Sequence, residues 1–149
     1  MSDTMPNYVA RKRFEDLSCA HRVWRGSERL RVLHGYARTV EIALTAASLD
    51  SAGAVVDFSG MKSLKALLEA QFDHTLLVAN DDPARQEFLA LQEVGAANVR
   101  LMDDVGLEGS ARWVADHVTE WLDKTYAGRV RLIDVIVEES SKNSVQLVI

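Results

Sequence analysis

The stretch VLHGYARTVEIALTAA, residues 32–47, decides the fold, because its alternating pattern predicts a long β-strand. A strand has a period of two, so one face carries His34, Tyr36, Arg38, Val40, Ile42 and Leu44. A second strand-like region, residues 8–24, ends in LSCAHRVW, and the polar RGSER that follows predicts a hairpin loop. The two strands therefore bring His21 and the His-Gly-Tyr triplet to one end of a hairpin.

Helices and a second hairpin are predicted in the rest of the chain. The first helix runs from about Ser59 or Gly60 to Phe72, DPARQEFLALQEVG forms a second, and a third runs from about Gly109 to Tyr126. ANVRLM is a short strand, and VRLIDVIVEE and SVQLVI are two strands joined by SSKN. This order predicts an α+β fold, with an antiparallel four-stranded sheet from two hairpins and helices packed on one face.

Composition limits the kinds of partner and the cellular location. A length of 149 residues indicates a single domain, 1–149, and a net charge of −5 argues against nucleic acid and anionic membrane surfaces as partners. No apolar run is long enough to span a membrane, and the polar start MSDTMPN is not expected to be a secretory signal. A single cysteine, Cys19, excludes an intrachain disulfide and fits the reducing cytoplasm.

Three groups of residues in this pattern indicate chemistry. His21 and His34, on neighbouring strands, are suited to hold a metal ion, although half-buried structural histidines are the alternative. Asp73-His74 follows the first helix, where the carboxylate orients the imidazole as a proton shuttle or simply caps the helix. Glu139 ends an apolar strand face, so it binds a ligand rich in N–H groups or lies in a solvated turn. We expect these groups to converge on one hollow.

The ordered series CAHRV, LHGYARTVEI, VVDFSGMK, FDHTLL, LEGSARWVA and VIVEES resembles the 6-pyruvoyl-tetrahydropterin synthase family, over roughly residues 14–149. That family includes the bacterial 6-carboxy-tetrahydropterin synthase of queuosine biosynthesis. The resemblance implies the T-fold, with two antiparallel hairpins and two helices between them. It also implies a homo-oligomeric barrel, commonly a hexamer of two trimers, with active sites at subunit boundaries.

The resemblance further implies a lyase reaction on 7,8-dihydroneopterin triphosphate, a pterin-type small molecule. In the family, zinc held by three histidines polarises side-chain oxygens, a cysteine thiolate acts as base, an Asp-His pair relays a proton, and a late glutamate binds the pterin ring. Triphosphate is eliminated, and the carboxy branch also releases acetaldehyde.

The family roles transfer to this chain residue by residue. The resemblance assigns His21, His34 and the Tyr36 place to zinc, and Asp73 and His74 to proton relay. It assigns substrate binding to Glu108 and Glu139, carboxylates that match the family's Thr-x-Glu segment and pterin clamp.

Two departures from the family pattern leave alternatives open. Tyr36 replaces the third zinc histidine, so the site holds zinc through a phenol or has lost the metal and become a polar pocket. The family cysteine, a few residues before His-Gly-His, is absent from RLRVL, where Leu30 lies near that place. Cys19 either replaces the missing ligand or catalytic base, or is a small buried hydrophobe.

We therefore expect a synthase-like lyase acting on dihydroneopterin triphosphate or a related pterin. The alternative is a non-lyase paralogue that binds a pterin or purine-like ring. A third reading, a structural or assembly partner, does not explain why Asp73, His74 and Glu139 are all present.

Overall fold

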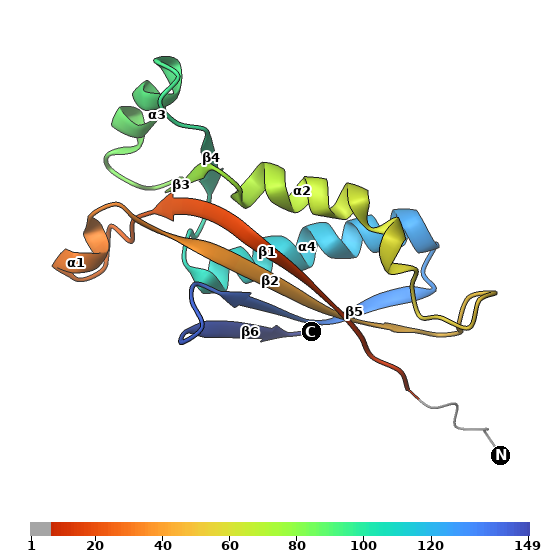
Figure 1. Cartoon of the computed structure of the whole chain (residues 1–149). Coiled ribbons are helices and arrows are strands. Elements are labelled where there is room, and N and C mark those ends of the chain that lie inside the picture. Colours follow the sequence, from red (N-terminus) through yellow and green to blue (C-terminus); the bar gives the residue numbers. More distant parts are fainter. Residues whose placement is uncertain (1–6) are drawn as a thin grey trace.

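The hairpin of residues 10–46 forms the centre of the sheet in the computed structural model, which describes residues 7–149 (Figure 1). The N-terminal residues 1–6, expected not to be a secretory signal, lie outside the described residues. None of the helices in the described part combines the length and apolar character needed to cross a bilayer.

The sheet has six strands in the order β4-β3-β1-β2-β5-β6. The strands are β1 (Ala10–His21), β2 (His34–Ala46), β3 (Thr75–Ala79), β4 (Val99–Met102), β5 (Val130–Glu138) and β6 (Ser144–Val148). The helices are α1 (Glu28–Arg31), the 3-10 helix η1 (Phe58–Gly60), α2 (Lys62–Phe72), α3 (Arg85–Glu93) and α4 (Leu107–Tyr126).

The expected four-stranded antiparallel sheet is wrong in strand number and in direction. The two predicted hairpins are present and pair antiparallel, but β3 pairs parallel with β1, and β4 pairs parallel with β3. The missed strand, TLLVA, is buried at every position, so it shows no alternation. Strands covered on both faces lose the period-two signal, and a short apolar run cannot be distinguished from a buried helix segment.

Helices cover both faces of the sheet, which corrects the expectation of a single helical layer. α2 and α4 lie over one face, and their buried residues join the main core with side chains of β1, β2 and β5 (Figure 1). α3 covers the other face of β3 and β4, where Phe88 and Leu89 pack against Leu76, Val78 and Val99. The predicted boundaries of α2, α3 and α4 agree with the structure within a few residues.

A β-bulge in β1 places the candidate residues on the face covered by α2 and α4. The register between β1 and β2 shifts between Phe14 and Leu17, and Asp16 takes a left-handed backbone conformation with φ of 60°. The three-residue spacing from Phe14 to Leu17 would otherwise direct these side chains to opposite faces. With the bulge, both are buried in the main core, and strand alternation then carries Cys19 and His21 on the same face.

An ion pair ties the β3–α3–β4 unit to the chain just after β1. Arg22 Nε donates to Asp82 Oδ2 at 2.8 Å, and the Asp82 side chain is 1% exposed. The Arg22 guanidinium lowers the pKa of Asp82 and also lies over the Phe88 ring. This contact fixes the position of Arg22 directly after β1, and therefore also the end of β1 that carries His21.

Candidate functional site

His21, His34 and Tyr36 lie together, as the alternation predicts. His21 ends β1 directly opposite His34 at the start of β2, and their ring centroids are 4.6 Å apart. The Tyr36 ring lies edge-on to His34 at 6.0 Å. Gly35 permits this close approach, because a Cβ there would lie 2.7 Å from the Cys19 carbonyl oxygen.

Arg38 is buried beneath this aromatic group, and the sequence pattern assigned it no role. Its side chain is 1% exposed and bridges β2 to the start of α4. Nη1 donates to Ser110 Oγ at 2.6 Å, while Nη2 lies 3.2 Å from the Val105 carbonyl oxygen and 3.3 Å from His21 Nδ1. Burial, reinforced by the charge of Arg38, lowers the pKa of His21 to about 3, so its imidazole is neutral at physiological pH.

His34 is well suited to be a metal ligand. Its Nδ1 lies 2.8 Å from the Val32 carbonyl oxygen, which can only accept, so Nδ1 carries the proton and the Nε2 lone pair is available. His21 has the opposite arrangement, because a guanidinium can only donate. Its Nδ1 lone pair accepts from Arg38, so the proton is on Nε2.

The donor set at this site therefore does not fit a zinc ion. His21 has no free lone pair, a buried cation lies beside it, and Tyr36 supplies a phenol in place of an imidazole. Within residues 7–149, no cluster of three or more His, Cys, Asp and Glu side chains is arranged to hold a metal.

Asp73 and His74 form a hydrogen-bonded pair that is anchored to β1. His74 Nδ1 donates to Asp73 Oδ1 at 3.0 Å, and Asp73 Oδ1 also accepts from the Ser18 backbone N–H at 3.3 Å. The backbone N–H of His74 donates to the Ser18 carbonyl at 2.6 Å, which holds His74 at φ of 58°. Asp73 is the C-cap of α2, so the predicted capping role and the pairing with His74 coexist.

The strained backbone of His74 exposes its imidazole to an open hollow of about 390 Å³. The imidazole side chain is 83% exposed. The residues around the hollow come from β1, β2 and the start of β3: Ser18, Cys19, Ala20, Gly35, Tyr36, Ala37 and Thr75.

The candidate groups do not share one cavity within a single chain. Ser18 and Ala20 alternate with Cys19 and His21 along β1, so the His74 hollow lies on the face opposite the histidine pair. Convergence across a subunit contact, which the family resemblance implies, stays a prediction.

Cys19 fits the buried-hydrophobe alternative. Its side chain is 4% exposed within the main core, and burial raises the pKa of its thiol. A thiol that stays protonated is a poor base and a poor metal ligand.

Glu139 lies in the turn after β5, one residue beyond the last pair of the β2–β5 ladder, Thr39 and Glu138. Its Oε1 accepts from Asn143 Nδ2 at 2.9 Å, and its backbone N–H donates to the Asn143 carbonyl. The carboxylate is half-buried, and its second oxygen is available to a ligand.

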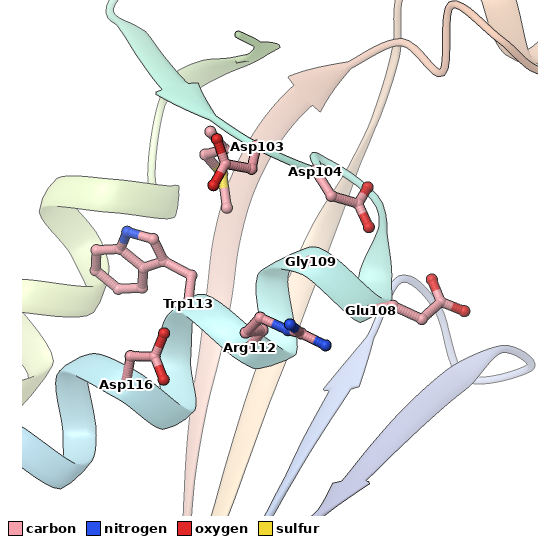
Figure 2. Close-up of a pocket in the computed structure, with 8 residues that line it drawn as sticks. Asp103, Asp104, Glu108, Gly109, Arg112, Trp113 and Asp116 are labelled. Atoms are coloured by element: carbon pink, nitrogen blue, oxygen red, sulfur yellow. The ribbon is translucent and has the colours of Figure 1, made fainter. Parts of the chain in front are cut away.

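Glu108 belongs to another pocket, of about 400 Å³, at the start of α4. Figure 2 shows it at one end of this pocket, with its carboxylate pointing away from Trp113 and Asp116. The remaining lining residues are Met102, Asp103, Asp104, Gly109 and Arg112. Glu108 is thus separate from both the histidine pair and the His74 hollow.

Gly109 allows the first turn of α4 to approach the Asp104 backbone, so Gly109→Ala is expected to be strongly destabilising. The added Cβ would lie 2.1 Å from the Asp104 carbonyl oxygen, and backbone on both sides must move. We expect the free energy of unfolding to fall by about 3 kcal/mol, the upper end for overpacking. Urea unfolding measures this, with Gly60→Ala as the control because its Cβ would meet open space. Equal midpoints for the two variants would contradict the expected clash.

Glu28 is a candidate that the sequence reasoning missed. It is an exposed carboxylate in the first turn of α1, six residues before His34. The family pattern predicts a cysteine in this segment, near the place that Leu30 occupies. The available signal was that Glu28 is the one carboxylate in the segment 22–33 that precedes His34.

Comparison with known proteins agrees with this fold. A family model described as 6-pyruvoyl tetrahydropterin synthase matches residues 10–148. The 6-carboxy-5,6,7,8-tetrahydropterin synthase of Rickettsia conorii is 34% identical over 68 residues, which are 45% of this chain and 49% of that protein. The match thus spans about half the length of that curated relative.

Solved structures are similar over nearly the whole chain. An uncharacterized protein of Wolinella succinogenes has a TM-score of 0.82 at 18% identity, covering 97% of this chain and 99% of that one. The Plasmodium vivax 6-pyruvoyl tetrahydropterin synthase has a TM-score of 0.65 at 18% identity, covering 94% and 97%.

Proposed function

Because the chain belongs to the 6-pyruvoyl tetrahydropterin synthase family, we propose that it is a lyase of this type acting on 7,8-dihydroneopterin triphosphate or a close pterin relative. The observation that carries the proposal is the Asp73–His74 pair. A strained backbone, two bonds to Ser18 and an exposed imidazole are features of a group held for proton transfer.

The proposed chemistry begins with a proton transfer at the pterin side chain. A base removes a proton from a side-chain carbon, and the neighbouring carbon–oxygen bond breaks, so that triphosphate leaves with the electron pair. His74 is suited to exchange protons through Nε2, because its Nδ1–H is bound to the Asp73 carboxylate.

Glu28 is proposed as the base in place of the family cysteine. A glutamate is named as a catalytic residue of the Plasmodium vivax enzyme. In this chain, Glu28 is the carboxylate of the short segment that separates β1 from His34. The buried Cys19 thiol is not suited to that role.

The chain is proposed to form a homo-oligomer of the family's barrel type, in which contacts between subunits complete the site. The proposed location is the cytoplasm. The His74 hollow is open, and it lies on the sheet face opposite His21 and His34. A second subunit is therefore needed to bring a histidine pair to the hollow and to enclose a ligand there. The two sheet edges, β4 and β6, are where such pairing would occur.

Glu139 is proposed to bind the pterin ring by accepting its N–H groups. Glu139→Gln is expected to weaken pterin binding roughly 10- to 100-fold, because a charged acceptor is replaced by a neutral one. Fluorescence quenching of the pterin measures this, and Glu138→Gln is the matched control, since Glu138 pairs with Arg13 instead. Equal weakening by the two variants would exclude a specific role for Glu139.

Incubation with 7,8-dihydroneopterin triphosphate tests the proposed function. Release of inorganic triphosphate, with binding of the pterin, supports the lyase. Binding without release supports the alternative, a non-lyase paralogue that holds a pterin or purine-like ring. That alternative is favoured by the missing family cysteine and by the contact of Arg38 with His21 Nδ1, which holds His21 in a tautomer that cannot bind a metal. Absence of both binding and release would overturn both functions.

A further inference from the structure

We propose that the Arg38 guanidinium takes the place of the metal ion implied by the family, so that the site of His21, His34 and Tyr36 works without a bound divalent cation. The family relationship implies zinc on this strand end. The contacts of this chain's own residues indicate a fixed organic cation instead.

The direction of the hydrogen bond to His21 is the first reason. A guanidinium has five N–H donors and no acceptor, so the contact of 3.3 Å makes His21 Nδ1 the acceptor. Metal binding through Nε2 requires the proton to move to Nδ1, where it would face the N–H of Arg38. One of the two imidazoles is therefore held in the tautomer that a metal cannot use.

The uncompensated charge of Arg38 is the second reason. Its partners, Ser110 Oγ, the Val105 carbonyl and His21 Nδ1, are all neutral, and its Nε has no partner among the described residues. The ion pairs of residues 7–149 do not include Arg38. A buried cation without a carboxylate repels a second cation placed beside it more strongly than an exposed one does.

This site can bind an oxygen of the ligand through hydrogen bonds, whereas a metal site would bind that oxygen through an open coordination position. The Nε2–H of His21 is a donor backed by the guanidinium on the opposite side of the ring, and the His34 Nε2 lone pair and the Tyr36 hydroxyl lie beside it. The two donors, His21 Nε2–H and the Tyr36 hydroxyl, suit an oxygen that carries or develops negative charge, such as a carbonyl or alkoxide oxygen of the ligand, whereas the unprotonated His34 Nε2 can accept from a ligand hydroxyl.

Zinc binding by variants of the full-length protein tests the inference. Chains purified without a metal-affinity tag are exposed to Zn²⁺, freed of excess ion and analysed for zinc content. Affinity is then measured by competition with a chromophoric chelator. Wild type is expected to retain far less than one zinc per chain. Tyr36→His restores the third imidazole but is expected to bind zinc weakly, because Arg38 is still present.

Adding Arg38→Gln to Tyr36→His is expected to tighten zinc binding roughly 10- to 100-fold, the range for changes to groups that orient metal ligands. Tyr36→His with Arg29→Gln is the matched control, because it removes the same charge from an exposed arginine of α1. Equal zinc affinity for Tyr36→His with and without Arg38→Gln would overturn the inference. So would one zinc per chain in wild type.

Nitrogen NMR of His21 in wild type provides a second test that needs no variant and therefore does not depend on Arg38→Gln folding. The ring shifts should report an Nε2–H tautomer that does not change on addition of Zn²⁺. An Nδ1–H tautomer, or a shift on adding zinc, would contradict the role of Arg38. These readouts are independent of triphosphate release, so the inference and the lyase proposal can fail separately.

Discussion

Replacement of His74 by asparagine is expected to lower the rate of triphosphate release roughly 100- to 10,000-fold, the contribution typical of a general acid–base group. The exposed imidazole is the only part of this residue that can exchange a proton, and asparagine cannot. Pterin binding should be nearly unchanged, since the imidazole is proposed to act on the side chain rather than to hold the ring. Steady-state release and equilibrium binding are measured on the same preparations.

Asparagine is chosen because it tolerates the left-handed conformation at φ of 58° better than other non-glycine residues. The bond from the residue 74 backbone N–H to Ser18 should therefore remain, and an unchanged unfolding midpoint would confirm it. Asp73→Asn leaves the imidazole in place but removes the charge bound to Nδ1, so a smaller loss is expected. A His74→Asn chain that releases triphosphate at the wild-type rate would remove the Asp73–His74 pair from the mechanism.

Glu28→Gln is expected to reduce triphosphate release at least about 100-fold, because the amide has nearly the shape of the carboxylate and cannot accept a proton. The side chain is exposed on a four-residue helix, so its removal should leave stability within about 0.5 kcal/mol. A loss of rate without a loss of stability would therefore identify a chemical role.

Glu87→Gln is the matched control for this substitution, since Glu87 is an exposed glutamate in the first turn of α3. Glu28→Asp retains a carboxylate on a shorter side chain and should recover part of the activity. If Glu28→Gln is as active as Glu87→Gln, the base is another group, and Glu28 is an ordinary surface residue of the loop.

The central hairpin and the long helices could be predicted because each buries one face and exposes the other. Alternation in β2 correctly placed His34 and Tyr36 on one face, and the 3.6-residue pattern located α2 and α4. β3 has no exposed face, and α3 has no fully buried residue, so neither the strand nor the sheet face covered by α3 could be predicted from periodicity.

The candidate site was predicted less completely, for a physical reason. Alternation predicts which face of a strand a side chain occupies, and it correctly placed Arg38 on the same face of β2 as His34. It does not state which donors meet which acceptors. The contact of Arg38 with His21 depends on the start of α4, over 60 residues away in the chain, where Ser110 and Val105 hold the guanidinium. The opposite orientation of His74 likewise depends on its bonds to Ser18.

The burial of Arg38 has a consequence for how such a protein matures. A guanidinium keeps its charge at every physiological pH, cannot be taken up by chelators and does not have to be delivered by a loading pathway. The positive charge at this strand end is thus acquired during translation and folding. On the inference drawn above, such a protein would need folding and subunit assembly, but no zinc, to complete its site.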